Sequence, residues 1–329
     1  MKIGVLDQSP IISGYRSVDA LRATIELAQR AEQLGFSRYW LAEHHAIAAL
    51  ADPCPEILVG RVAAATSTMR VGTGGVLLPY YSALKMAEVF RMLEALFPGR
   101  IDLGIGRAPG GDMRTAKALA GGRYDAAENF PQQVYELAGY LDGNLPDDHP
   151  FAQVRVMPEV DTSPEIWLLG SSDYSAALAC QLGLPFAFAH FINSHGGDGV
   201  TRAYRQQYRA SARRPQPRAM VCAFVVCAER SEHAERLAQS IDLRRLQMAL
   251  GIDSPIPTLA EAETREYSAQ ERAYIAQQRV RAVIGNPTQV RQQLEDLRER
   301  YETDELMLLT ITGDYKSRLE SYELIAQSC

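Results

Sequence analysis

Short runs of apolar residues alternate along the chain with longer segments in which apolar positions recur at helical spacing. The short runs predict strands, because a strand covered on both faces is hydrophobic at nearly every position. The longer segments predict helices that each bury one face. The predicted strands are residues 3–8, 39–43, 69–73, 101–106, 166–169, 186–189, 219–227 and 306–310.

The predicted helices have recognisable ends. A helix over 18–34 follows a Ser17 cap and stops at Gly35, a second runs from about Pro55 to Ser67, and Asn286-Pro287 opens another. Eight strands that are each followed by a helix predict an α/β fold, a closed (β/α)₈ TIM-like barrel, which needs about 250 residues. An open doubly wound sheet is the structural alternative. No repeat or linker interrupts the pattern, so residues 1–329 are predicted to form one domain.

Three longer stretches interrupt the alternation, at 107–124, 142–164 and 251–285. They place insertions after strands 4 and 7 of the predicted barrel. The stretch 251–285 contains a capping box, Ser268 with Glu271, and therefore predicts helices of its own. An insertion of this size is either a lid over the barrel mouth or an arm that contacts a second copy.

Composition excludes several classes of function. The chain is 47% hydrophobic and carries a net charge of −6 without long runs of like charge, so neither a nucleic-acid groove nor a membrane surface is indicated. The N-terminus already reads as a strand, and no apolar run could span a bilayer. Five scattered cysteines predict reduced thiols, hence a cytoplasmic protein. Cys222 and Cys227 are expected in the core, whereas Cys54 is a weaker candidate for the site.

The most informative polar residues are Glu43, His44 and His45, which follow the second predicted strand. The carboxyl ends of the strands are where α/β folds build their sites. An imidazole facing such a site titrates near neutral pH and can serve as a general acid or base. A metal site is not indicated, because adjacent strand residues point to opposite faces and no further ligand pattern completes a set.

Two other strand ends carry residues suited to an anion. Arg107 leaves the fourth strand in a glycine-containing loop, and Gly170-Ser171-Ser172 joins the fifth strand to a helix. Backbone amides and hydroxyls at a helix N-terminus can bind phosphate. The alternatives are that Ser172 is an ordinary N-cap and that Arg107 forms a surface ion pair. Gly74 and Gly75 end the third strand. Either these glycines allow another group to approach the backbone closely, or they simply begin an ordinary loop.

Dinucleotide binding through a Rossmann fingerprint is not supported. The glycine-rich stretches at 72–79 and 104–109 have leucine and proline where the last glycine of the fingerprint belongs. No phosphate-binding loop of the Gly-x-x-x-x-Gly-Lys type and no Gly-x-Ser-x-Gly elbow is present.

Together these segments resemble the bacterial luciferase-like flavin monooxygenase family, in its single-chain, small-molecule branch. The resemblance spans nearly the whole chain, and four motifs carry it: Tyr39-Trp40-Leu41-Ala42-Glu43-His44-His45, Val71-Gly72-Thr73-Gly74-Gly75-Val76-Leu77-Leu78-Pro79, Gly99-Arg100-Ile101-Asp102-Leu103-Gly104-Ile105-Gly106-Arg107-Ala108-Pro109-Gly110 and Leu168-Leu169-Gly170-Ser171-Ser172.

The resemblance implies reduced FMN at the carboxyl-terminal mouth of the barrel. It implies that His44 is the imidazole beside the flavin, that Arg107, Ser171 and Ser172 bind its phosphate, and that a non-proline cis peptide occurs at Gly74-Gly75. It also implies a separate flavin reductase and suggests a homodimer. The sequence departs from relatives at the strand-six exit, where the role of His190 is open, and at Arg123, for which a phosphate contact is weakly supported.

The expected function is a two-component monooxygenase, in which reduced FMN and O₂ form a flavin C4a-peroxide that oxidises a small organic substrate. His44 would supply or accept a proton, and the mouth would exclude water. Two alternatives remain: an enzyme that transfers hydride with the deazaflavin F420, and a protein that binds flavin without catalysis.

Overall fold

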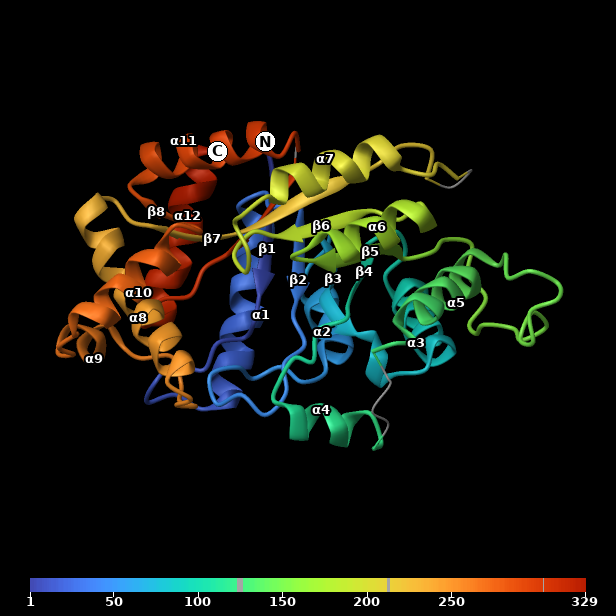
Figure 1. Ribbon diagram of the computed structural model, residues 1–329, viewed down its shortest axis with the longest axis horizontal. Coiled ribbons are helices and arrows are strands. Elements are labelled where there is room, and N and C mark those ends of the chain that lie inside the picture. The colour runs from blue at the N-terminus through green and yellow to red at the C-terminus, as the bar shows by residue number, and fades with distance from the viewer. Residues whose placement is uncertain (123–126, 212–213, 304) are drawn as a thin grey trace.

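The computed structural model describes residues 1–329 except 123–126, 212–213 and 304, and its strands form one parallel sheet (Figure 1). Pairing of β6 with β7 and of β9 with β1 closes the sheet, so the predicted (β/α)₈ barrel is confirmed and the open doubly wound alternative is wrong. The barrel strands, in order around the ring, are β1 (Lys2–Asp7), β2 (Arg38–Leu41), β3 (Arg70–Leu77), β4 (Ile101–Gly106), β5 (Glu165–Gly170), β6 (Phe186–Ala189), β7 (Ala219–Cys227) and β9 (Glu305–Leu309).

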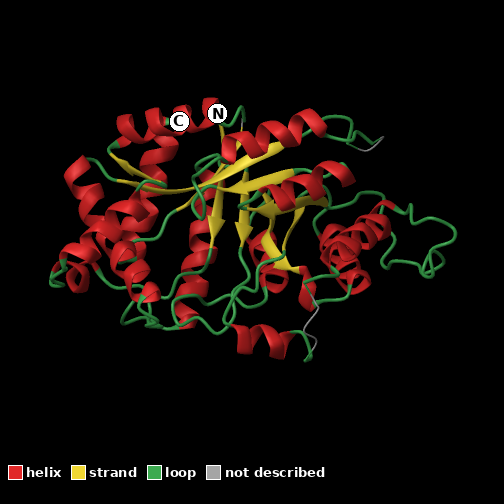
Figure 2. Cartoon of the chain, in the orientation of Figure 1, coloured by secondary structure: helices red, strands yellow, loops and turns green. Residues whose placement is uncertain are grey.

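Helices surround the strands (Figure 2). They are α1 (Ser17–Gln33), α2 (Pro55–Ala65), α3 (Ala83–Leu96), α4 (Met113–Leu119), α5 (Phe130–Asp142), α6 (Asp173–Leu182), α7 (Gly197–Gln207), α8 (Ser231–Ala249), α9 (Leu259–Glu263), α10 (Ala269–Arg279), α11 (Pro287–Arg300) and α12 (Tyr315–Ser328), together with a 3₁₀ turn at Leu78–Tyr80. The predicted capping box of Ser268 with Glu271 opens α10, and Asn286 caps α11.

The structure corrects several predicted boundaries. The cap of α1 is Arg16 rather than Ser17, because the Asp19 side chain accepts the Arg16 N–H and completes a capping box. Strand β2 ends at Leu41, two residues before Glu43, and α2 ends at Ala65. The insertion at 251–285 ends in a short ninth strand, β8 (Ala282–Gly285), which pairs with the last residues of β7 outside the barrel. Only three of its residues, Ala282, Val283 and Ile284, form an apolar run, which is too short to predict a strand.

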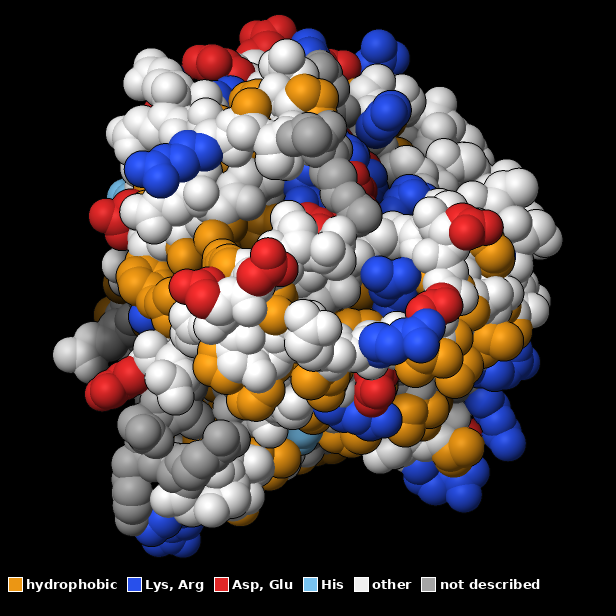
Figure 3. Space-filling model, turned by 90° about the vertical axis from the view of Figure 1, so that its right-hand side faces the viewer, with side chains coloured by type: hydrophobic (Ala, Val, Ile, Leu, Met, Phe, Trp, Pro, Cys, Tyr) orange, Lys and Arg blue, Asp and Glu red, His pale blue; other side chains and the backbone are white. Residues whose placement is uncertain are grey.

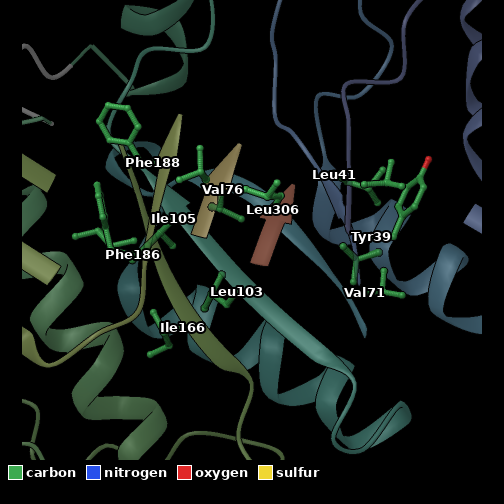
Figure 4. Packing of buried hydrophobic residues seen from close by; sticks show 14 of the residues in the cluster. Tyr39, Leu41, Val71, Val76, Leu103, Ile105, Ile166, Phe186, Phe188 and Leu306 are labelled. Carbon is green, nitrogen blue, oxygen red and sulfur yellow. The ribbon is translucent and has the colours of Figure 1, made fainter. Parts of the chain in front are cut away.

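Alternating strand residues separate two apolar layers. One set, including Tyr39, Leu103 and Phe186, packs between the barrel and its helices (Figure 4). The other set, including Trp40 and Met307, fills the barrel interior. Because a strand places successive side chains on opposite faces, a barrel strand must be apolar both at the positions that face inward and at those that face the helices. Cys222 lies in the interior layer and Cys227 in the outer one, which confirms the expectation that both belong to the core.

Buried charges close the barrel at the amino ends of the strands. Arg38 donates to Asp102 at 2.6 Å and also pairs with Glu305, while Arg70 donates to the other oxygen of Asp102. Trp40 adds a hydrogen bond from its indole N–H to Asp102 at 2.9 Å. Each of these buried charges at the amino ends therefore has a partner, which is the condition for tolerating ions in a core.

The opposite end of the barrel is open to the loops that follow the strands. Helix α4 lies at this end, away from the two chain termini (Figure 1). The segment that contains α9 and α10 packs on the same chain: Ile256 bridges to Ile12, Asp253 accepts the Ala48 N–H, and Arg281 donates to the carbonyl of Ile192. It therefore covers one side of the mouth. Within the described residues, no helix is long and apolar enough to cross a membrane.

Candidate functional site

A cavity of about 270 Å³ opens at the carboxyl ends of the barrel strands. The predicted residues Glu43, His44, Gly74, Gly75, Arg107, Gly170, Ser171 and Ser172 line it, and they come from the ends of β2, β3, β4 and β5. A larger polar hollow of about 580 Å³ lies between the start of α8 and α12, but none of its described lining residues belongs to the predicted site. The barrel mouth is therefore the candidate site.

His44 presents a neutral imidazole to this cavity. Burial lowers the pKa of His44 to about 4. The ring Nδ1 is buried and has no hydrogen-bond partner among the described residues, whereas the backbone N–H donates to the carbonyl of Asp52 at 3.0 Å. A buried polar atom without a partner is uncommon and often marks a functional group. The ring as a whole is only partly buried and lines the cavity, so the imidazole can contact a ligand there.

Glu43 has both carboxylate oxygens engaged. Its Oε1 lies 2.7 Å from Nε2 of His45 and accepts the Tyr81 hydroxyl at 2.8 Å, and its Oε2 accepts the Leu77 N–H at 2.8 Å. These bonds join the loop after β2 to the end of β3. His45 turns toward Glu43 and is not one of the described residues that line the cavity. Glu43 and His45 together hold the cavity wall around His44.

Further carboxyl groups lie behind this wall. Asp52 is buried, and burial together with the charges of Asp7, Glu56 and Glu43 raises its pKa to about 7. Its Oδ1 accepts the N–H of Cys54 at 3.1 Å, while its Oδ2 has no partner in the described part of the chain. Cys54 is the N-cap residue of α2 and is absent from the described lining of the cavity, so the structure does not bring it to the site.

Glycines let the backbone itself form part of the cavity wall. A Cβ on Gly75 would lie 2.6 Å from the carbonyl oxygen of Gly104, and one on Gly74 would lie 2.6 Å from Leu6. These positions therefore cannot carry a side chain without displacing β4 or the barrel interior. The peptide bond between Gly74 and Gly75 is cis, as the resemblance implies.

The rim at β4 and β5 carries groups suited to an anion. Arg107 is exposed, stacks on the ring of Tyr174 at 4.0 Å and forms no ion pair with a described residue. Ser172 occupies the N-cap position of α6, yet its hydroxyl makes no capping hydrogen bond. Ser171, Ser172 and Ser175 all line the cavity at this helix N-terminus, where a phosphate is favoured. The ordinary-cap alternative explains the position of Ser172 but leaves its hydroxyl unused.

Sequence reasoning missed part of the lining. Gln8 follows β1, Phe191 and Ile192 follow β6, and Cys222 faces inward from β7. Gln8 could have been found by applying the strand-end rule to β1. His190 instead lies outside the cavity lining, where its Nδ1 contacts the Tyr301 hydroxyl at 2.8 Å. Burial and the charges of nearby arginines lower the pKa of His190 to about 4.

Two remaining predictions concern other sites. Arg123 lies outside the described residues, so its relation to the cavity stays a prediction. Among the residues that the structure describes, no group of three or more His, Cys, Asp or Glu side chains could hold a metal ion.

Comparison with known proteins identifies the family. The sequence profile of luciferase-like monooxygenases matches residues 1–303. The chain belongs to the luciferase-like monooxygenase family. A luciferase-like monooxygenase of Escherichia coli K12 is 38% identical, with 97% of this chain and 94% of the relative covered. An N-acetyl-S-alkylcysteine monooxygenase of Bacillus subtilis is 34% identical, with 100% and 98% covered.

Solved structures agree with this assignment. The apo-MsnO8 structure superposes on this luciferase-like chain with a TM-score of 0.91 and 38% identity, covering 99% of this chain and 98% of the other. The oxygenating constituent of 3,6-diketocamphane monooxygenase in complex with FMN has a TM-score of 0.71 at 17% identity, covering 100% and 97%, and shows the fold alone. The predicted family is therefore confirmed, and the chain is a member of an oxidoreductase family.

Proposed function

We propose that this protein is a two-component monooxygenase that uses reduced FMN and O₂ to oxidise a small organic substrate. The observation that carries the proposal is the mouth cavity, which combines a neutral imidazole, a bare glycine wall and an anion-binding rim in a luciferase-like barrel. Each feature occurs at the carboxyl ends of the strands, where barrel enzymes hold their reactants.

The residues present fit a flavin mononucleotide. Gly74 and Gly75 offer backbone without side chains, as a flat ring system requires for close approach. Arg107, Ser171 and Ser172 would hold the phosphate, because they combine one cation free of described ion pairs with hydroxyls and amides at the start of α6. The bound flavin would supply the electrons and the activation of O₂.

The side chains around the cofactor would have separate tasks. His44 is neutral above about pH 4, so its ring can accept a proton from the reacting groups. Glu43 and His45 would position His44, because their hydrogen bonds fix the loops on either side of it. The segment with α9 and α10 would exclude water from that side of the mouth.

Two relationships to other molecules follow from this proposal. A separate reductase would supply the reduced flavin, in keeping with the absence of a dinucleotide fingerprint. The substrate would be a small organic molecule, in keeping with the relative named N-acetyl-S-alkylcysteine monooxygenase.

The protein would also form a homodimer. An apolar groove between α2 and α3 is lined by the exposed side chains of Ile57, Met92 and Met157, which are 72%, 52% and 51% exposed. Figure 3 shows that hydrophobic side chains are exposed between charged ones on the side of the molecule that carries α5. Glu56, Lys85 and Glu88 border the groove with both signs of charge, so two copies related by a two-fold axis can pair opposite charges across it. Met92→Glu should convert a dimer to a monomer in light scattering.

The test is oxygen incorporation. Protein loaded anaerobically with reduced FMN would be mixed with ¹⁸O₂ and a panel of thioethers, ketones and aldehydes, and the products weighed by mass spectrometry. We expect one ¹⁸O atom in a product. Tight binding of reduced F420 with hydride transfer and no oxygen incorporation would replace the proposal with the deazaflavin alternative. Flavin binding without any product would favour a non-catalytic flavin-binding protein.

A further inference from the structure

The mouth cavity has two chemically different halves. The half at the ends of β3, β4 and β5 carries the bare glycines, Arg107 and the serines that would hold the flavin. The other half lies at the ends of β6 and β7, and its lining residues are Ala187, Ala189, Phe191, Ile192 and Cys222. None of these five side chains carries a charged group at neutral pH, so this half provides apolar contact surface for a ligand.

Strand register makes this apolar surface continuous. Ala189 of β6 pairs with Cys222 of β7, and Ala187 lies two positions earlier on the same face of β6. Phe188 alternates to the helix side and belongs to the outer apolar layer (Figure 4). The Phe191 N–H donates to the Cys222 carbonyl at 3.1 Å, so the chain after β6 turns back over β7. Because both inward positions of β6 are alanines, space remains in front of them.

The ionisable groups of the lining leave no charge free for a ligand in this half. Among the described lining residues they are Glu43, His44, Arg107 and Cys222. Both carboxylate oxygens of Glu43 are engaged, and His44 is neutral above about pH 4. Burial raises the pKa of Cys222 to about 12, so its thiol is neutral as well. Arg107 belongs to the flavin half, where the phosphate would pair with it.

One arginine approaches the apolar half from outside the lining. Arg281 donates to the carbonyl of Ile192 and to the side chain of Gln278, and it is not among the described residues that line the cavity. A charged group that entered this half would therefore lose its hydration without gaining a counter-ion, which is costly. An uncharged apolar group would instead gain the free energy of removing its surface from water.

We propose that the half of the cavity at β6 and β7 selects the substrate by an uncharged, apolar group, and that Ala189 limits the size of that group. The substrate class is then a neutral organic compound, such as an alkyl or aryl thioether, whose apolar part lies against Ala189, Cys222 and Phe191. The inference rests on the proposed function, because it names the substrate class of the same cavity.

The test is equilibrium binding to protein saturated with oxidised FMN, without reductant, so that no turnover occurs. The probes, compared by calorimetry at neutral pH, are benzyl methyl sulfide, protonated N-methylbenzylamine and phenylacetate, which are similar in size and differ in charge. We expect the sulfide to bind about 10-fold or more tightly than either ion, because an unpaired charge loses its hydration on entry. Equal or tighter binding of either ion, or no binding of the sulfide, would overturn this inference alone.

Matched variants locate the selection at Ala189. Ala189→Leu places a larger side chain beside Cys222 and should weaken sulfide binding about 10-fold or more while FMN affinity stays unchanged. Ala203→Leu adds the same atoms to the exposed face of α7 and should change neither affinity. Ala189→Asp should reverse the preference between sulfide and amine, a gain of binding that misfolding could not produce.

The outcomes of these experiments are distinguishable. Sulfide binding by Ala189→Leu that equals the wild type would overturn the role of Ala189, and so would an unchanged preference in Ala189→Asp. Failure of the wild type to bind FMN would overturn the proposed function instead.

Discussion

Asp52 carries a stability cost that a single substitution should remove. Burial, with the charges of Asp7, Glu56 and Glu43, raises its pKa from 3.8 to about 7. The folded protein therefore keeps a proton on Asp52 between about pH 4 and pH 7 that the unfolded chain has lost. With fewer protons bound in the unfolded state, stability falls as pH rises through this window. Asp52→Asn imitates the neutral acid and should escape this loss.

The magnitude follows from the two pKa values. Their difference of about 3 corresponds to about 4 kcal/mol, fully developed above pH 7. Unfolding entropy for 329 residues is about 0.7 kcal/mol per kelvin, so the variant should melt roughly 6 °C higher than the wild type at pH 8. At pH 4 the two proteins should melt together, because both then carry a neutral group.

Calorimetric melting of both proteins from pH 4 to pH 8 tests this reasoning. His44 and His190 titrate in the opposite sense, since lowered pKa values make stability rise with pH between about 4 and 6.5. The difference between variant and wild type isolates Asp52 from both. Asp147→Asn, on the exposed 142–164 loop, is the matched control and should show no such difference. A difference for Asp52→Asn that does not grow with pH would refute the burial argument.

Three further substitutions probe the site and its support. His44→Ala should slow oxygenation at least tenfold, because the imidazole accepts or supplies a proton, while FMN affinity should change less than threefold. A large loss of FMN binding would instead make His44 a structural residue. Gly75→Ala should lower the free energy of unfolding, measured in urea, by about 1–3 kcal/mol, because the added Cβ would lie 2.6 Å from the Gly104 backbone. Gly106→Ala is the control and should be tolerated, because its added Cβ would lie 3.8 Å from the nearest atom. Equal losses of stability in the two variants would contradict this packing. Arg38→Met should cost about 3 kcal/mol, the low end of the range for breaking a buried ion pair, because Asp102 and Glu305 lose their shared cation while Asp102 keeps Arg70 and Trp40. An unchanged stability would contradict this account of the charges at the amino ends of the strands.

Sequence reasoning located the barrel because its signals are local. Each strand is a run of apolar residues, and the rule that sites form at strand ends placed Glu43, His44, Arg107 and Ser171 at one mouth without any knowledge of their contacts. The structure brings His44, Arg107 and Ser171 to one cavity, and the loops supply the rest of its wall.

What the sequence left undetermined depends on contacts between distant residues. The hydrogen bond from Tyr81 to Glu43 turns that carboxylate into a support for the wall. The raised pKa of Asp52 needs burial and three other carboxylates, which no local pattern reports. The short strand β8 is defined by its pairing with β7 rather than by its composition.

The most direct test of the account is an anaerobic titration of the wild-type protein and of Arg107→Met with reduced FMN, reduced riboflavin and reduced F420. We expect the wild type to bind FMN at least tenfold more tightly than riboflavin, because the rim at Arg107 and Ser171 holds the phosphate. Arg107→Met should weaken FMN binding and leave riboflavin binding unchanged. Equal affinity for FMN and riboflavin, or tighter binding of F420, would contradict the assignment of this mouth to reduced FMN.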